Sequence, residues 1–202
     1  TWFVTFGLWR ADNKSQLQMA RHFRHAAMVS TRGAAGAAAQ VTQVSSFKGG
    51  MQLHDDRFLD IVHEDWWGEP TAVMTTIFPS VIFQQQVNSV STRHIQPDGH
   101  GNFDFVWTHF GFADDTPEMT ARRLRQANLF GPAGFVSADD GEAIELSQCG
   151  FTQKPQHRAL AELGGRGVEE TDHMVTETLI RGMYAYWRKV MEAEPQSAKE
   201  GA

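Results

Sequence analysis

Regular alternation of apolar and polar positions is strongest in the middle of the chain, where it predicts three strands. Residues 71–78, 81–96 and 103–112 are rich in β-branched and aromatic side chains, as strands usually are. The PDGHGN segment at 97–102 is rich in turn-forming residues, so it predicts a hairpin whose flanking strands are antiparallel neighbours. Residues 25–33 (HAAMVSTRG) favour one more short strand that ends at a glycine.

Apolar positions recur at helical spacing after the last of these strands. Thr116 predicts an N-cap, and Pro117 suits the first position of the helix that follows it. A second helix is expected to begin near Pro132. After a loop over residues 151–168, the apolar stripe of residues 169–191 predicts a long amphipathic helix. Strands followed by helices predict an α+β domain, in which the last helix lies across a curved antiparallel sheet and leaves a ligand cavity between them.

The two ends of the chain differ in character. Residues 1–10 (TWFVTFGLWR) are dense in aromatic side chains and lack an initiating Met, which predicts the interior of a packed segment rather than a natural terminus. Residues 193–202 are mostly polar and are expected to form a disordered tail. We therefore expect one domain over residues 1–192 that has been cut on its N-terminal side.

Composition narrows the class of protein. The 202 residues are 41% hydrophobic and 21% charged, which is typical of a globular domain with a sizeable core. A net charge of −6 without a basic stretch argues against a nucleic-acid partner. The lone cysteine, Cys149, excludes an internal disulfide and, with no signal peptide, predicts a cytoplasmic protein. No apolar run approaches the roughly 18 residues of a membrane span.

Two adjacent acids, Asp139 and Asp140, follow a Gly-Pro-Ala-Gly turn in apolar company. Successive side chains on a helix point about 100° apart, so Asp140 shares its side with Val136 and Ile144, which is the more apolar side. A buried carboxylate needs a partner, a proton or a metal ion, and this makes Asp140 a candidate metal ligand. The alternative is a solvated acidic pair near a helix N-terminus, where the helix dipole favours negative charge.

Amide side chains alternate along the predicted strand at 81–96. Gln84, Gln86 and Asn88 would share one face, where they could bind a polar substituent of a ligand, such as a carboxylate or hydroxyl. The alternative is a solvated face. His94 belongs to the same predicted strand, and it either faces the pocket or is a satisfied residue of the sheet.

A second pair of candidate metal ligands lies earlier in the chain. His22 and His25 stand three residues apart, a spacing that on a helix would present both rings to one metal ion. Because a strand is predicted to start here, a polar surface pair is the favoured interpretation.

Four segments resemble a known family. Residues 125–145 (RQANLFGPAGFVSADDGEAIE) closely resemble the segment of Rieske non-haem iron ring-hydroxylating oxygenases, in the large (alpha) subunit, that supplies the third iron ligand. Residues 78–97 and 104–111 resemble the strands of its catalytic domain, and residues 175–191 resemble its C-terminal helix. The resemblance runs from Thr1 to about Met191 and is closest to the salicylate hydroxylase and anthranilate dioxygenase branch. It implies a helix-grip (START-like) catalytic domain that is truncated at its N-terminus.

The resemblance also implies roles for individual residues. Asp140 maps to the iron ligand, while Phe130 and Val136 map to positions that line the substrate pocket; some relatives carry Trp at the latter. The two histidine ligands of the family occur in a D-x-x-H-x(4)-H type segment, and its Rieske domain uses Cys-x-His and Cys-x-x-His ligands. Neither pattern occurs in this chain. We therefore expect that the chain alone neither binds iron tightly nor turns over substrate.

The complete family enzyme implies several cofactors and partners. Electrons from NAD(P)H pass through a reductase, sometimes with a ferredoxin, to a 2Fe-2S cluster and then to mononuclear Fe(II), which uses O2 to hydroxylate an aromatic ring. The branch implies an aromatic acid such as salicylate or anthranilate, and a homotrimer or an alpha3beta3 assembly. The alternative function is a non-enzymatic helix-grip module that binds a small molecule, and such a module has no use for the acid at position 140.

Overall fold

The computed structural model describes residues 14–20, 24–31, 57, 60–69, 71–157, 162–172 and 176–192. The sequence predictions for residues 1–10 and for the tail at 193–202 lie outside these described residues. The described elements, in chain order, are β1 (Lys14–Met19), β2 (His25–Thr31), η3 (Asp65–Trp67), β3 (Ala72–Ile77), β4 (Val81–Gln86), β5 (Ser89–Pro97), β6 (Phe103–Phe110), α2 (Pro117–Phe130), α3 (Phe135–Gln153) and α4 (Thr178–Glu192).

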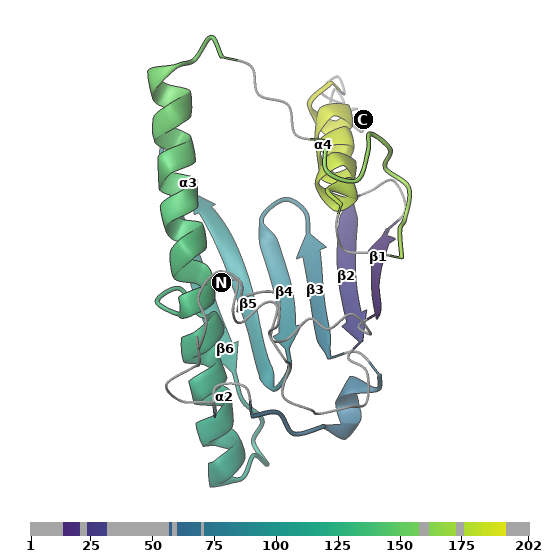
Figure 1. Cartoon of the computed structure of the whole chain (residues 1–202), viewed down its shortest axis with the longest axis vertical. Coiled ribbons are helices and arrows are strands. Elements are labelled where there is room, and N and C mark those ends of the chain that lie inside the picture. Colours follow the sequence, from purple (N-terminus) through teal and green to yellow (C-terminus); the bar gives the residue numbers. More distant parts are fainter. Residues whose placement is uncertain are drawn as a thin grey trace, which may run out of the picture.

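The strands form one six-stranded antiparallel sheet in which each strand pairs with the next in the sequence, from β1 to β6 (Figure 1). The predicted strands at 71–78 and 103–112 are confirmed with slightly shorter bounds, and the one at 25–33 is confirmed over its described residues, 25–31. The predicted hairpin turn after β5 is also confirmed. Gly99 and Gly101 adopt positive φ angles of 67° and 97° there, a conformation that glycine reaches without steric cost.

The prediction of a single strand over residues 81–96 is wrong. The segment folds into β4 and β5, which pair with each other across a two-residue turn at Val87 and Asn88. Val87 has a φ of 49°, which is rare for a β-branched residue, so its sequence carries no ordinary turn signal. The side chain of Val87 is buried in the core, and this packing holds the turn in place.

The first two helices follow the predictions closely. The Thr116 hydroxyl accepts a hydrogen bond of 3.2 Å from the backbone N–H of Met119, which caps α2. The helix α3 begins directly after Gly134, where an added Cβ would lie only 2.2 Å from the carbonyl oxygen of Leu129. Only glycine allows this close approach, and the tight connection sets the path of α3 after α2.

The C-terminal helix is shorter than predicted, because α4 begins at Thr178 rather than at residue 169. The preceding loop is held by side chains from the first turns of α4. The Arg181 guanidinium donates hydrogen bonds to the carbonyl oxygens of Gly167 (2.7 Å) and Leu163 (3.1 Å), and the Thr178 hydroxyl donates to that of Glu169 (3.0 Å). These contacts use the loop carbonyls that a longer helix would have paired internally.

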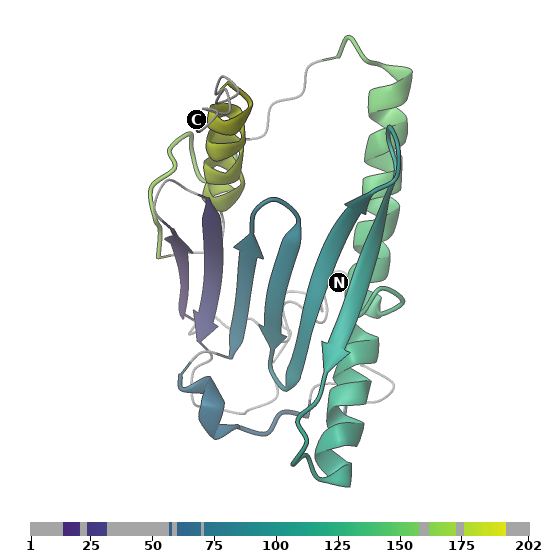
Figure 2. The same ribbon diagram turned by 180° about the vertical axis from the view of Figure 1, so that it is seen from behind.

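The helices flank the sheet at its two sides. The helices α2 and α3 run along β5 and β6, and α4 contacts β1 and β2 at the opposite side (Figures 1 and 2). Tyr186 of α4 packs edge-on against Phe78, with ring centroids 5.0 Å apart. An antiparallel sheet contacted by a C-terminal helix agrees with the predicted α+β helix-grip layout. No helix within the described ranges is long and apolar enough to cross a membrane.

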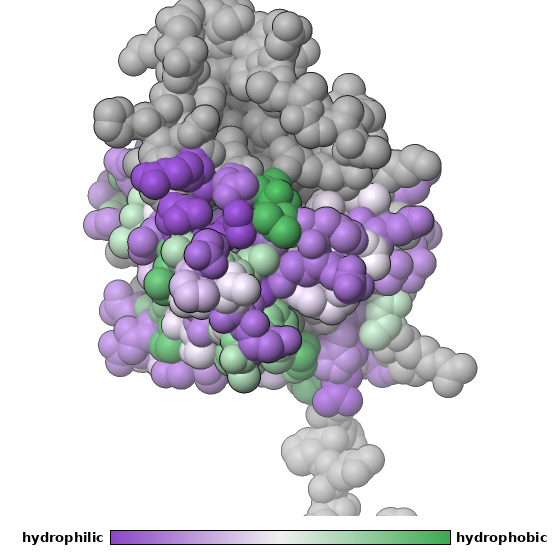
Figure 3. Space-filling view, turned by 90° about the horizontal axis from the view of Figure 1, so that it is seen from below, coloured by the Kyte–Doolittle hydropathy of each residue, from purple (hydrophilic) through white to green (hydrophobic). Residues whose placement is uncertain are grey.

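The buried core lies where α2 meets the turn between β4 and β5. Trp67, Val87, Leu129 and Phe130 form this core, and the partly buried Ile61 and Val136 pack against it. Seen from below in Figure 3, the described surface is mostly hydrophilic, with hydrophobic residues in small patches between the polar ones.

Candidate functional site

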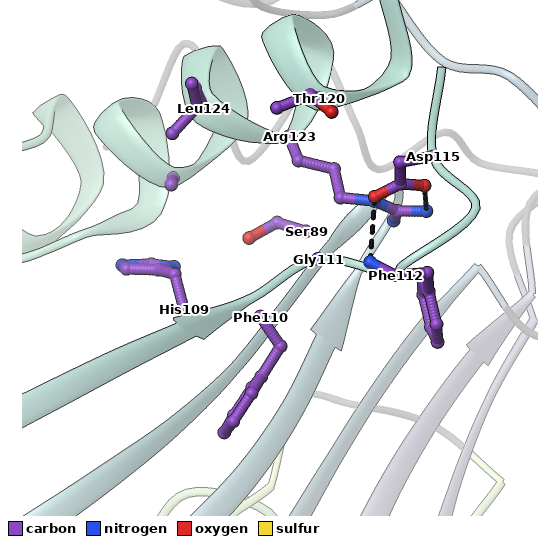
Figure 4. A pocket seen from close by; sticks show the side chains of 10 residues that line it. Ser89, His109, Phe110, Gly111, Phe112, Asp115, Thr120, Arg123 and Leu124 are labelled. Carbon is purple, nitrogen blue, oxygen red and sulfur yellow. Dashed lines mark hydrogen bonds and ion pairs between the residues drawn. The ribbon is translucent and has the colours of Figure 1, made fainter. Parts of the chain in front are cut away.

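One face of the sheet carries the polar and aromatic side chains that lie near α2 and α3. Arg93 of β5 pairs with Trp107 of β6, and Ser91 pairs with His109. On the other side of β5, Gln84 of β4 pairs with Ser91. Directly paired residues of an antiparallel sheet project to the same side, so all of these side chains share one face. Figure 4 shows His109 pointing toward α2, and Phe110 pointing the opposite way.

Arg93 is the unusual residue of this face. Its guanidinium lies over the Trp107 ring, 4.1 Å from the ring centroid, and its buried Nε has no hydrogen-bond partner. Burial lowers the pKa of Arg93 to about 10, and the carboxylate of Asp140 opposes that shift. Arg93 is therefore a partly desolvated cation, and the acid on α3 offsets only part of the effect of burial.

His109 continues the same row of rings. It stacks on Trp107 with centroids 5.9 Å apart, and burial, followed by repulsion from Arg93, lowers the pKa of its imidazole. A Cβ added to Gly131 would lie 3.3 Å from His109 Nε2 and 2.4 Å from the carbonyl oxygen of Ala127. The glycine of the Gly-Pro turn thus allows the start of the α3 segment to approach the sheet beside His109.

Asp140 lies on α3, and its side chain is exposed. Of the two interpretations that the sequence left open for the acidic pair, burial of Asp140 is not found, because α3 is exposed from Ala138 to its end. Only the beginning of the helix, through Val136, packs against the core. The negative charge of Asp140 acts on Arg93 and favours the charged form of that guanidinium.

The described residues could supply only part of the ligand set of a metal site. No group of three or more His, Cys, Asp or Glu side chains among them is placed to hold a metal ion. The carboxylate of Asp140 is an oxygen ligand of the kind that completes a two-histidine, one-carboxylate iron site. The other ligands of such a site would have to come from outside the described residues.

The two predicted pocket residues beside the acidic pair lie together in the core. Phe130 is 2% exposed, and Val136 packs against the cluster that contains it. The Ser137 hydroxyl donates a 3.0 Å hydrogen bond to the carbonyl oxygen of Phe130, which ties the first turn of α3 to the end of α2. Asp140 lies one turn further along the same helix as Val136.

The amide residues separate into two groups. Gln84 and Gln86 share the face of Arg93, and the Gln84 amide contacts that of Gln86. Asn88 belongs to the turn after β4, so the strand alternation that grouped it with the glutamines does not extend to it. The Oε1 atom of Gln84 is buried without a hydrogen-bond partner, so this face retains an unused acceptor.

The structure does not bring the other predicted histidines to this face. His94 pairs with Val81 and Val106, which places it on the opposite side of the sheet from Arg93, where it is exposed and contacts Gln96. His25 lies in β2, and its Nδ1 accepts a hydrogen bond of 3.2 Å from the backbone N–H of Phe78. His22 lies outside the described residues.

A buried ionic cluster that the sequence did not predict lies at the start of α2. The Arg123 guanidinium donates two hydrogen bonds to the Asp115 carboxylate, at 2.7 and 2.8 Å, and others to Glu64 and to the carbonyl oxygen of Asn88. The Asn88 side chain, which is fully buried, donates to Val62 and Glu64. Arg123, Asp115 and His109 also line an open pocket of about 220 Å³ between β6 and α2 (Figure 4).

The charges of this cluster are mutually satisfied. Hydrogen bonds from Arg123 lower the pKa of Asp115. Burial by itself would raise the pKa of Glu64, but hydrogen bonds from Arg123, Asn88 and Trp66 outweigh it and lower that pKa. Burial by itself would lower the pKa of Arg123, but both acids outweigh it and raise that pKa. The cluster therefore braces α2 against the β4–β5 turn.

Comparison with known proteins gives the family. The model of the ring-hydroxylating alpha subunit, catalytic domain, matches residues 7–193, so the chain belongs to this family of oxygenase subunits. The chain is 73% identical over 192 residues to the large oxygenase component of salicylate 5-hydroxylase from Ralstonia sp, covering 95% of this chain and 45% of that protein. It is 36% identical over 191 residues to the large subunit of anthranilate 1,2-dioxygenase from Burkholderia cepacia, covering 93% and 45%.

These relatives confirm the predicted family and the predicted branch. The chain spans 45% of the length of each of these two relatives. The helix-grip binding module without enzymatic activity, which was the alternative interpretation of the sequence, is not favoured by these matches.

Proposed function

We propose that this chain acts as part of the catalytic domain of an aromatic-ring-hydroxylating oxygenase whose substrate is an aromatic acid such as salicylate or anthranilate. The 73% identity to the large component of a salicylate 5-hydroxylase is the observation that carries the proposal. Because the chain spans 45% of that relative, the remaining parts of the enzyme are proposed to be supplied by the rest of a longer subunit.

Asp140 is proposed to be the carboxylate ligand of a mononuclear Fe(II). Bound iron would supply the activation of O2, and two histidines from outside the described residues would complete its protein ligands. The position of Asp140 on α3, one turn beyond Val136 at the edge of the buried core, supports this role. Phe130 at the end of α2 and Val136 in the first turn of α3 would form an apolar wall near the iron.

The task of the described residues is to hold an aromatic ring and to exclude water. The apolar core under α3 and the aromatic row on β6 offer the flat surfaces that an arene packs against. Gln86, on the polar face of β4, is proposed to bind a polar substituent of the ring and so to fix its orientation. His94 and Asn88 remain outside this arrangement, for the geometric reasons given above.

The cofactors and partners follow the same proposal. Electrons from NAD(P)H would reach the iron through a reductase, with or without a ferredoxin, and through a 2Fe-2S Rieske cluster in another part of the subunit. A homotrimer or an alpha3beta3 assembly is proposed for the complete enzyme. Membership of the family of ring-hydroxylating alpha subunits supports these partners.

The decisive experiment is the replacement of the proposed iron ligand in the full-length oxygenase subunit. Asp140→Ala is expected to lose stoichiometric iron, measured by elemental analysis after desalting, together with ring hydroxylation. The neighbouring Asp139→Ala is the matched control, and it should keep both, since it removes the same charge one helix position away. If Asp140→Ala retained its iron while the control behaved as expected, the proposed ligand would be wrong.

A second experiment tests the orienting amide. Gln86→Leu in the same enzyme is expected to weaken the preference for salicylate over naphthalene, because the substitution removes a hydrogen-bonding group but keeps the size of the side chain. The preference is measured as the ratio of kcat/KM values for the two substrates. An unchanged ratio would remove Gln86 from the pocket.

A further inference from the structure

The starting observation is a cation whose hydrogen-bonding capacity is not used. The guanidinium of Arg93 lies over the Trp107 ring, its Nε is buried, and that atom has no hydrogen-bond partner. Among the described residues, no acid forms an ion pair with it, although Asp140 is near enough to influence its charge. A buried donor without a partner is costly, so it calls for an acceptor from outside the described chain, such as a ligand or a water molecule.

The missing acceptor should be an anion. If iron binds Asp140 as proposed above, the metal compensates the charge of that carboxylate, and Arg93 is left without a counter-ion. A guanidinium is planar and is matched by a carboxylate, which can accept two parallel hydrogen bonds from it.

We propose that Arg93 is a specificity-determining residue that binds the carboxylate of an aromatic acid substrate. This inference rests on the proposed function and deepens it, because it explains why an acid rather than a neutral arene is accepted. Trp107 keeps the guanidinium in place, and the position of Arg93 on the interior strand β5 makes the anchor rigid.

A second unused group on the same face agrees with such a substrate. Gln84 is 3% exposed, and its Oε1 has no hydrogen-bond partner. Its partner on β5 is Ser91, which lies two residues before Arg93 on the same side of that strand. A ring with a carboxylate and an adjacent hydrogen-bond donor, such as a hydroxyl or an amine, would satisfy both groups of the protein.

A competing role for Arg93 is to orient Asp140 and not to bind substrate. The two roles predict different losses. Loss of an orienting residue would lower the iron content and would weaken acidic and neutral ligands alike. Loss of a carboxylate anchor would leave the iron content unchanged and would weaken only the acid.

The experiment compares salicylate with its neutral isostere salicylamide. Binding of each is measured at equilibrium, without O2 and without turnover, to the iron-loaded full-length oxygenase. In Arg93→Gln, we expect the Kd for salicylate to rise about 10- to 100-fold, since a charge-assisted hydrogen bond is lost. The Kd for salicylamide should change less than about threefold, and Arg93→Lys should be intermediate because it keeps the charge but not the planar fork.

Arg188→Gln is the matched control, because it removes the same charge from an exposed position on α4. It should leave both dissociation constants unchanged. Equal losses for the two ligands in Arg93→Gln, an unchanged Kd for salicylate, or a loss of iron would each overturn the proposal. Its failure is separable from failure of the proposed function, because the iron content of Asp140→Ala tests the latter independently.

Discussion

Two arginines on neighbouring elements differ in how many of their donors have hydrogen-bond partners. Arg123 on α2 is 5% exposed and is surrounded by acceptors from Asp115, Glu64 and Asn88. Arg93 on β5 lies against an aromatic ring, and its Nε has no acceptor. The pKa shifts follow this difference, because the partners of Arg123 raise its pKa whereas burial lowers that of Arg93 to about 10. A saturated buried charge indicates a structural role, and an unsaturated one indicates a binding role.

The largest expected effect on stability comes from replacing Arg123, the arginine whose hydrogen-bond donors are paired. Arg123→Met leaves Asp115 and Glu64 buried without their cation, which should lower the free energy of unfolding by about 3–5 kcal/mol. Arg93→Met is the matched substitution and should cost less than about 1 kcal/mol, mainly the cation–π contact. Urea unfolding of the two variants measures both. Equal losses would contradict the division into a structural and a binding arginine.

Asn88 sharpens the comparison, because the sequence grouped it with the binding residues and the structure places it in the cluster of Arg123. Its side chain makes hydrogen bonds of 2.7 Å to the carbonyl oxygen of Val62 and 2.6 Å to Glu64. Asn88→Ala should destabilise the protein by about 1–3 kcal/mol, because buried groups lose their partners. The Kd for salicylate should stay unchanged in the folded variant. A weaker salicylate affinity at unaltered stability would return Asn88 to the pocket.

The cluster also predicts how stability depends on pH. Asp115 and Glu64 have pKa values below their ordinary 3.8 and 4.5 in the folded protein. Their contribution to stability is therefore complete above those ordinary values, and it is lost as the pH falls through the lowered ones. The free energy of unfolding should decline with acidification below about pH 4.5, and less steeply in Asp115→Asn. An identical slope in variant and parent would mean that other groups dominate acid unfolding.

The sequence predicted the parts of the fold whose signals are local. Thr116 and Pro117 marked the start of α2, and the glycine-rich turn marked the β5–β6 hairpin, because capping and turn chemistry are written in a few adjacent residues. The turn at Val87 was missed because its conformation is imposed by burial in the core, which no neighbouring residue reveals. The early start predicted for α4 has a similar origin. The segment before Thr178 is a loop, and Arg181 donates a hydrogen bond to the carbonyl oxygen of Gly167 in it.

The candidate site was predictable only where a motif carried it. Asp140 was found through its apolar neighbours and through the family segment, but its relation to Arg93 depends on how α3 lies beside β5. Arg93 itself carried no signal, because an arginine in a strand usually belongs to a solvated face. Glu64 and Arg123 are 59 residues apart in the chain, so only the folded structure could bring their charges together.

The smallest effect concerns the helix that presents Arg123. The Thr116 hydroxyl caps α2 beside Asp115, whose carboxylate also accepts a 2.9 Å hydrogen bond from the backbone N–H of Phe112. Thr116→Ala should cost about 1 kcal/mol of stability, and Thr116→Ser should restore most of it, since the serine hydroxyl can accept the same bond. Combining Thr116→Ala with Arg123→Met shows whether cap and cluster are coupled. Additive losses would mean that the ionic cluster stands without the cap, whereas a combined loss smaller than the sum would mean that the cap acts by holding Asp115 against Arg123.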